Sequence, residues 1–237
     1  MIVVIGLPAY SGSAAGEGSA GGLAVEAAAA AHARGSSVEL VGKVGDDGAG
    51  DAVVLALGRL GIGHAALLRD PARPTPLLSA VAAATKLDSA DDLAENELTA
   101  ATLAGDIGDE EPPVEVELLP ADPAARPGLD AGDISLAMHY LAEARVVVLA
   151  EPLPELAVAA VVEGATFAGA RLVVLLSPGA TPPSLPQEAT LLEAPVVDDG
   201  SFGRVVGAFA AGLDAGTDAA AAFAEAVRVS GWEAVAD

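Results

Sequence analysis

The chain has 237 residues, and its 34 acidic residues against 11 basic residues give a formal net charge of -23 at pH 7. This length predicts one α/β domain, or one domain with a small appendage, because two independent domains would both be small. The sequence contains no cysteine, which excludes disulfides, thiol nucleophiles and cysteine-based zinc sites. The acidic balance argues against binding to nucleic acid or to anionic membranes, which proteins hold mainly through lysine and arginine.

The excess of acidic residues and the scarcity of lysine favour a protein from an organism that lives at high salt. Lysine is nearly absent, because only Lys43 and Lys86 accompany the arginines. In about 1 M salt the screening length falls to roughly 3 Å, which quenches the repulsion among so many carboxylates. The composition therefore favours a halophilic protein, and an acidic protein from a GC-rich mesophile is the alternative.

Targeting signals are not evident. The first residues, Met1 to Gly6, carry no basic region of the kind that opens a signal peptide. The most apolar later stretch, residues 156–176, is interrupted by Glu163 and Arg171, which argues against a membrane span. We therefore expect a cytoplasmic protein.

Apolar runs typical of buried strands alternate with segments of helical period. The strand-like runs are residues 2–5, 38–41, 65–68, 76–81, 114–119, 146–149 and 172–176. The helical segments are residues 23–34, 50–60, 133–144, 153–168, 203–215 and 219–229, with Asp133 and Asp218 as expected N-caps of two of them. This alternation predicts a mostly parallel sheet with helices on both faces, that is, a single three-layer α/β/α domain over residues 1–237.

Two segments are expected to form a small β lid, residues 8–20 and residues 65–84. The first is rich in glycine, serine and alanine, and the second holds two strand-like runs joined by the proline-containing link 70–74. We expect these two runs to pair with each other as antiparallel edge or lid strands. A lid that pairs across a two-fold axis would make a homodimer, which the sequence leaves open.

A glycine-rich motif precedes the first helical segment. Residues 16–21 satisfy G-x-G-x-x-G, and Glu39 lies near the position of a ribose-binding acid, which would suggest a dinucleotide site. That site needs its first glycine directly after the strand, whereas ten residues separate Gly6 from Gly16. A hinge over a substrate, or a plain surface loop, explains the motif better.

The segment from Gly21 to Gly50 resembles the first signature of the ribokinase-like (phosphofructokinase-B) carbohydrate kinases. The matching residues are Gly21, Gly22, Ala33, Arg34, Gly35, Val41, Gly42, Val44, Gly45, Asp46, Asp47 and Gly50. The resemblance implies a ribokinase-type fold with a lid, and ATP-dependent phosphotransfer to a sugar or nucleoside hydroxyl with Mg²⁺ bridging the phosphates. It also implies that Gly21, Gly22 and Glu26 bind the substrate.

A second, weaker resemblance lies near the end of the chain. In the family, a late helix opens with glycines whose amides collect the charge of the transferred phosphoryl group, and an acid there takes the proton from the sugar hydroxyl. The resemblance implies that the nucleotide and its phosphates are bound by Ser177, Gly179, Gly200, Ser201 and Gly203.

The acid of that second signature is missing. Its position falls on Gly203 or Arg204, or on Gly207 with a larger shift, and none of these residues accepts a proton near neutral pH. Asp198 or Asp199 could substitute from upstream, although an acid there is more often a helix cap. We therefore assign no catalytic residue.

Two further positions depart from the family pattern. Where the family has an asparagine that contacts the sugar, this chain has Glu26. Where the family has an aspartate that binds sugar hydroxyls, this chain has Ser11. The alternative function is therefore that of a catalytically silent relative, which binds small molecules or supports assembly. The three histidines are scattered along the sequence, so we predict no metal site on the protein.

Overall fold

The computed structural model describes residues 1–12, 18–81, 115–196 and 200–231. The chain forms a large compact unit, Met1–Leu78 with Leu118–Asp237, and a small one, Ser79–Glu117. In the small unit the described residues are the ends of two strands. The prediction of a single domain over the whole chain stays a prediction.

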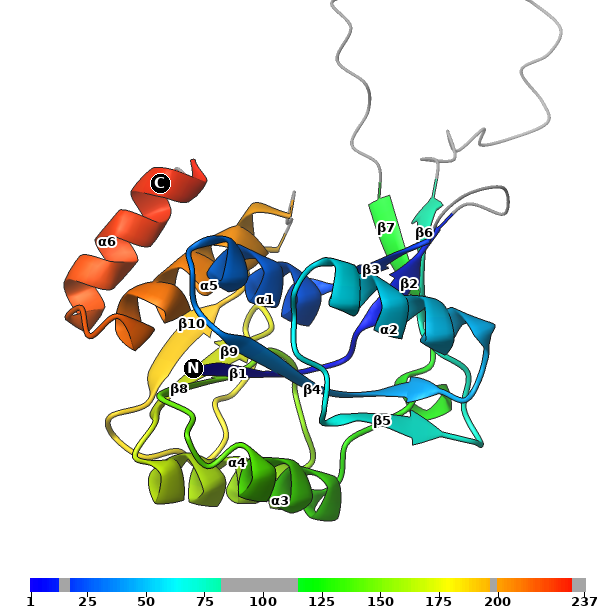
Figure 1. Cartoon of the computed structure of the whole chain (residues 1–237), viewed down its shortest axis with the longest axis horizontal. Coiled ribbons are helices and arrows are strands. Elements are labelled where there is room, and N and C mark those ends of the chain that lie inside the picture. Colours follow the sequence, from blue (N-terminus) through cyan, green and yellow to red (C-terminus); the bar gives the residue numbers. More distant parts are fainter. Residues whose placement is uncertain (13–17, 82–114, 197–199, 232–237) are drawn as a thin grey trace, which may run out of the picture. The chain divides into compact units, whose positions relative to one another are not determined.

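The large unit is built on a six-stranded sheet in the order β10-β9-β8-β1-β4-β5 (Figure 1). Each strand pairs in parallel with its neighbours, and Ile2 of β1, for example, lies opposite both Val38 and Val146. The strands are β1 (Ile2–Ile5), β4 (Val38–Gly45), β5 (Leu67–Asp70), β8 (Val146–Leu149), β9 (Arg171–Leu176) and β10 (Thr190–Glu193).

Helices cover both faces of this sheet. In Figure 1, α1, α2 and α5 lie on one side of the strands and α3 and α4 on the other. The α-helices are α1 (Leu23–Ala33), α2 (Gly48–Arg59), α3 (Ala131–Tyr140), α4 (Glu155–Ala168), α5 (Ser201–Asp214) and α6 (Ala219–Ser230), and a short 3-10 helix spans Pro123–Ala125. The predicted three-layer α/β/α architecture with a parallel central sheet is therefore confirmed.

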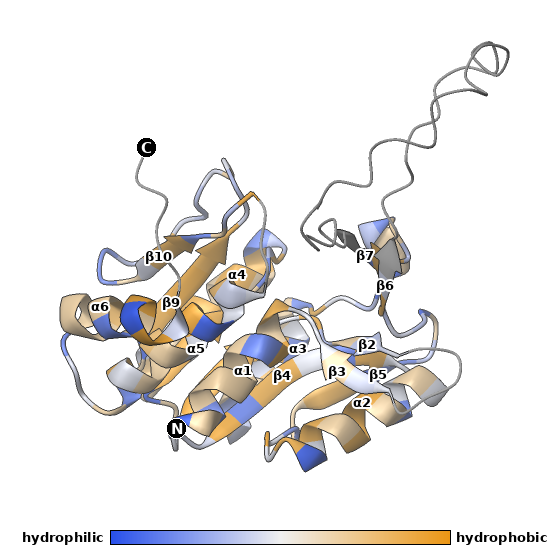
Figure 2. Cartoon of the chain, turned by 90° about the horizontal axis from the view of Figure 1, so that it is seen from above, coloured by the Kyte–Doolittle hydropathy of each residue, from blue (hydrophilic) through white to orange (hydrophobic). Residues whose placement is uncertain are grey.

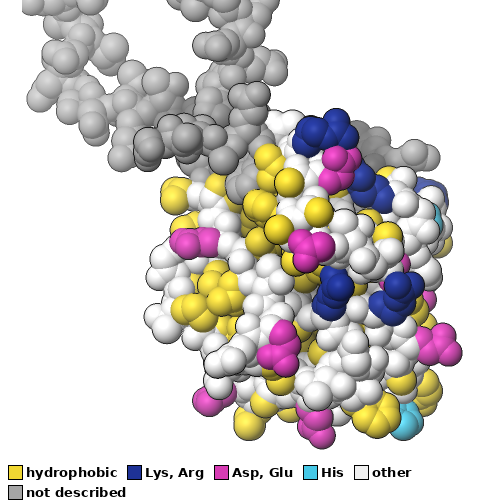
Figure 3. Space-filling model, turned by 90° about the vertical axis from the view of Figure 1, so that its left-hand side faces the viewer, with side chains coloured by type: hydrophobic (Ala, Val, Ile, Leu, Met, Phe, Trp, Pro, Cys, Tyr) yellow, Lys and Arg dark blue, Asp and Glu magenta, His cyan; other side chains and the backbone are white. Residues whose placement is uncertain are grey.

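Successive side chains of a strand point to opposite faces of the sheet, so the core consists of two layers. Ile2 and Val4 of β1 pack in a cluster with α1 and α5, whereas Val3 and Ile5 pack in a cluster with α3 and α4. Figure 2 shows β9 as one of the most hydrophobic segments, as expected for a strand covered on both faces. On the face shown in Figure 3, acidic side chains are spread among apolar ones rather than gathered in one cluster.

A second sheet has the order β3-β2-β6-β7 and consists of β2 (Ala9–Ser11), β3 (Ser19–Gly21), β6 (Leu77–Val81) and β7 (Glu115–Leu119). The expected antiparallel pairing of residues 65–68 with 76–81 is wrong. β4 continues to Gly45, beyond its predicted end at residue 41, and its second half pairs in parallel with β5. β6 instead pairs in parallel with β2, where Tyr10 lies opposite Leu77.

The two predicted helix caps have different outcomes. Asp218 caps α6 as expected, since its carboxylate accepts hydrogen bonds from Ala220 and Ala221. The cap of α3 is Asp130 rather than Asp133, and the helix begins earlier than predicted. Asp133 stands three residues into a capping box and also receives Lys43 Nζ at 2.5 Å, so its carboxylate ties β4 to α3.

Candidate substrate site

The order of the strands points to one place on the central sheet. From β1 the chain proceeds to β4 and β5 on one side, and it then returns to β8, β9 and β10 on the other. In open α/β sheets ligands bind outside the carboxyl ends of the strands where the order reverses, which here lies between β1 and β8.

Side chains and backbone from separate segments meet at this reversal. Leu7 follows β1 and Glu151 follows β8, and the amide of Leu7 donates a hydrogen bond to the Glu151 carboxyl group. The carbonyl oxygen of Leu7 lies 3.4 Å from the point where a Cβ on Gly22 would stand. The backbone of Leu7 therefore lies between Glu151 and the glycine pair that opens α1.

Glu151 has unusual electrostatics. Burial raises its pKa to about 7, although the Leu7 amide and the charge of Arg126 act in the opposite direction. Arg126 is itself held in place, because its guanidinium donates to the carbonyl oxygens of Leu118, Pro120 and Ala121. A carboxyl group that titrates near neutrality in a crevice is a candidate functional group.

Glu151 also lines a cavity of about 150 Å³ beside β8 and β9. The polar residues Ser177 and Thr181 line the same cavity, and Ser177 is one of the residues predicted to bind the nucleotide. Gly179, another predicted residue, is exposed, and its amide donates to Glu193 Oε1 at 2.7 Å. The structure therefore brings Ser177, but not the Gly179 amide, to the edge where Glu151 lies.

Glu26 and Gly203, two further predicted residues, meet where α1 contacts α5, and Figure 1 shows these two helices side by side. Glu26 Oε2 lies 2.7 Å from the point where a Cβ on Gly203 would stand and 4.0 Å from the corresponding point on Gly200. Gly22 has φ 94° and precedes α1, and Gly200 has φ 79° and precedes α5, so glycine suits both helix starts. A predicted substrate residue of α1 thus lies against the first turn of α5.

The three α5 positions that correspond to the acid of the family signature have different surroundings. Gly203 and Gly207 both face α1, because a Cβ on Gly207 would stand 2.6 Å from Ala30 Cβ and 2.8 Å from the Ala31 amide nitrogen. Arg204 is exposed, whereas Asp198 and Asp199 lie outside the described residues. Close helix packing therefore explains the two glycines.

Ser11 and the glycine-rich motif belong to the second sheet. Ser11 ends β2, and its Cβ lies 3.7 Å from the point where a Cβ on Gly21 would stand. A Cβ on Gly18 would overlap the ring of Tyr10, so close packing against an aromatic ring explains that glycine. Gly16 lies outside the described residues. Ser11 and Gly21 are therefore neighbours, although the sequence places them ten residues apart.

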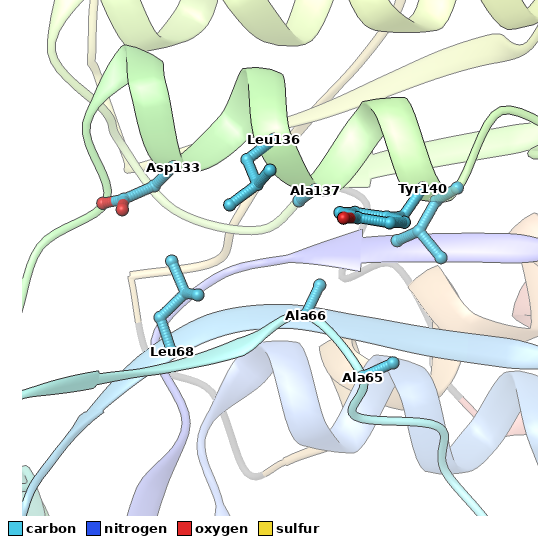
Figure 4. Close-up of a pocket in the computed structure, with 8 residues that line it drawn as sticks. Ala65, Ala66, Leu68, Asp133, Leu136, Ala137 and Tyr140 are labelled. Carbon is cyan, nitrogen blue, oxygen red and sulfur yellow. The ribbon is translucent and has the colours of Figure 1, made fainter.

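A larger cavity of about 480 Å³ lies elsewhere, between α3 and the edge strand β5 (Figure 4). Leu136 and Tyr140 of α3 point toward Leu68 and Ala66 across it, and Asp133 lies at one end. Its lining is mainly apolar and includes none of the predicted site residues. We therefore place the candidate substrate site at the carboxyl edge of β1 and β8.

The raised pKa of Glu151 predicts how stability depends on pH. The native state keeps a proton that the unfolded chain loses between pH 4.5 and about 7, so stability falls as the pH rises through this window. Glu151→Gln, which can still accept the Leu7 amide, is expected to match the parent at pH 4 and to exceed it at pH 8 by on the order of 3 kcal/mol. Urea unfolding at both pH values measures this difference. Glu163→Gln, exposed on α4, is the surface control, and an equal response in both variants would contradict the assignment.

The described residues contain neither a cluster of metal-ligating side chains nor a membrane-spanning helix. In residues 1–12, 18–81, 115–196 and 200–231, no three histidine or carboxylate side chains gather as a metal site would require. None of the helices in these ranges is both long and apolar enough to span a bilayer.

Solved structures share this fold, although no family model and no curated protein matches the sequence. The protein named Sa239 is 12% identical with a TM-score of 0.65, over 99% of this chain and 95% of that one. Ribokinase from Arabidopsis thaliana, complexed with ribose and ATP, is 14% identical with a TM-score of 0.61, over 97% and 90%. An uncharacterized sugar kinase from Pyrococcus horikoshii, in complex with ATP, is 16% identical with a TM-score of 0.50, over 74% of this chain and about half, 53%, of that one. The chain therefore has the ribokinase-like fold that the resemblance predicted.

Proposed function

We propose that this chain is a carbohydrate-kinase-like protein that binds a sugar or a nucleoside at the carboxyl edge of β1 and β8, with ATP as the phosphoryl donor. The observation that carries the proposal is the position of Glu151 at the reversal of strand order, hydrogen-bonded to Leu7 beside Gly22. A carboxyl group and backbone amides in a crevice are suited to the hydroxyl groups of a polyol. The fold shared with sugar kinases supports the same assignment.

The head of α5 is the proposed place of the phosphates of ATP. The N-terminal amides of a helix favour anionic groups. Gly200, Ser201 and Gly203 would form this turn of the phosphate site, and Ser177 would contribute a hydroxyl group. Mg²⁺ would supply positive charge to the phosphates. A phosphate-bound Mg²⁺ usually has only one or two protein carboxylates among its ligands.

One observation favours the second candidate function, a relative that binds ligands without transferring phosphate. Gly203 and Gly207 are packed against α1, so the described part of α5 offers no carboxylate of its own at its head. A missing general base lowers the rate by about 10²- to 10⁴-fold. This candidate would retain the same ligands.

Isothermal titration with ATP·Mg²⁺ and a panel of sugars and nucleosides tests the proposal. We expect at least one sugar or nucleoside to bind, and we expect Glu151→Ala to weaken that binding at least tenfold while Glu163→Ala leaves it unchanged. Phosphate transfer to the bound ligand then distinguishes the kinase from the silent relative. A protein that binds none of these ligands would contradict both candidates.

A further inference from the structure

Glu26 and Gly203 share one space between α1 and α5. The Cβ of Glu26 lies 2.6 Å from the point where a Cβ on Gly203 would stand, which is closer than side chains allow. A side chain can therefore enter this space from α1 or from α5, but not from both. In this chain the side chain that enters from α1 is that of Glu26, which carries a carboxylate.

The carboxylate of Glu26 lies beside the first turn of α5. Glu26 Oε2 is 2.7 Å from the point where a Cβ on Gly203 would stand. The same oxygen is 4.0 Å from the Cβ point of Gly200, so it stands beside the turn at which α5 begins. Glu26 is only half-buried.

The proposed reaction needs a proton acceptor at this place. Transfer of a phosphoryl group to a hydroxyl requires a group that takes the hydroxyl proton next to the amides that stabilise the phosphoryl charge. We infer that Glu26 is this proton acceptor, supplied by α1 in place of a residue of α5. The inference rests on the proposed function, and it names the residue that the sequence left unassigned.

The substrate hydroxyl gives its proton to the Glu26 carboxylate, and the same oxygen forms a bond to the terminal phosphorus of ATP. The bond between that phosphorus and the bridging oxygen of ADP breaks, and ADP leaves with the electron pair. The carboxylic acid on Glu26 then returns its proton to solvent.

Glu26→Gln is the direct test, because it keeps the size of the side chain and removes the acceptor. Using the full chain with ATP·Mg²⁺ and the sugar or nucleoside found by titration, we expect kcat to fall by about 10²- to 10⁴-fold. Binding of both ligands, measured by calorimetry, should change less than about threefold. Glu155→Gln, an exposed acid in the first turn of α4, is the matched control and should leave kcat unchanged.

An exchange of the two residues gives a second test. Gly203→Asp alone should be unstable because it meets Glu26, and Glu26→Gly alone should lack the acceptor. The double variant Glu26→Gly with Gly203→Asp returns the carboxylate to the same space from α5. It should unfold at a higher urea concentration than Gly203→Asp and transfer phosphate at least tenfold faster than Glu26→Gly.

The outcomes separate this inference from the proposed function. Transfer that is undiminished in Glu26→Gln overturns the inference, and so does a folded double variant that is no faster than Glu26→Gly. A parent protein that binds both ligands without transferring phosphate overturns the inference and leaves the binding site standing. If the parent binds no sugar, no nucleoside and no ATP, the proposed function itself fails and the inference fails with it.

Discussion

Gly207→Ala is expected to destabilise the protein by about 2 kcal/mol, as overpacking of a close-packed interior typically does. The added methyl group would meet the carbonyl oxygen of Ala27, Ala30 Cβ at 2.6 Å and the Ala31 amide nitrogen at 2.8 Å. Two of these three contacts are backbone atoms of α1, which cannot turn aside as a flexible side chain would. The helices must separate, and the cluster that holds Phe202, Val206 and Phe209 would lose contacts with α1.

Gly58→Ala is the matched control for this substitution. Gly58 also lies within a helix, α2, but it is exposed, and a Cβ there would meet only His64 at 3.8 Å. Alanine has the higher helix propensity, so this variant should be more stable than the parent by about 0.5 kcal/mol. Urea unfolding of both variants at one salt concentration measures the two effects. Equal effects of the two substitutions would show that α1 and α5 are not in close contact.

The glycines of α5 show what a sequence pattern leaves out. Gly203 and Gly207 stand at positions where the family signature has an acid, so the sequence alone indicates that the acid is lost. In the structure they are four residues apart on one face of α5, where small residues allow α1 to approach closely. Glu26 also departs from the family pattern, in a different part of the sequence. The pairing of Glu26 with Gly203 depends on the packing of two helices that are far apart in the chain, which local periodicity does not specify.

The strands of the central sheet were largely predictable because they are continuously apolar. β1 and β8 have the predicted bounds, and each is buried along its whole length. β10 was missed because its residues alternate between half-buried and exposed, as expected at the edge of a sheet. The predicted strand 65–68 begins two residues before the observed β5, and its predicted partner was wrong. The pairing of an edge strand depends on its neighbour in the sheet, which local sequence does not specify.

Glu151 was the functional candidate that sequence analysis missed. Its signal was present, because an acid that follows a buried strand by two residues stands at the edge where ligands of parallel sheets bind. The order of the strands was needed to recognise that β1 and β8 are neighbours at the reversal. The raised pKa depends on burial by the surrounding chain and on the Leu7 amide, which no local pattern contains.

Asp47 lies in the segment Gly45-Asp46-Asp47, and its side chain joins the start of α2 to the loop that holds Thr75. Its Oδ1 accepts the amide of Gly50 at 2.8 Å, which caps α2, and also the hydroxyl of Thr75 at 2.6 Å. Its Oδ2 accepts the Thr75 amide at 2.8 Å. Thr75 is 2% exposed, and its hydroxyl oxygen accepts the amide of Gly45, so these groups have no access to water as a substitute.

Asp47→Ala is therefore expected to destabilise the protein by about 3 kcal/mol, which combines the loss of an N-cap with buried donors left without an acceptor. Asp46→Ala, the exposed neighbour, should change stability by less than about 0.5 kcal/mol.

The difference in stability between Asp47→Ala and the parent should also depend on pH. Burial acts to raise the pKa of Asp47, but the hydrogen bonds from Thr75 and Gly50 outweigh it and hold the pKa below its ordinary value. The stabilisation by the Asp47 charge is therefore complete above that ordinary value and is lost as the pH falls through the lower native pKa. Urea midpoints of both variants and the parent, measured at pH 7 and again in acid, would contradict this role if Asp47→Ala and Asp46→Ala behaved alike.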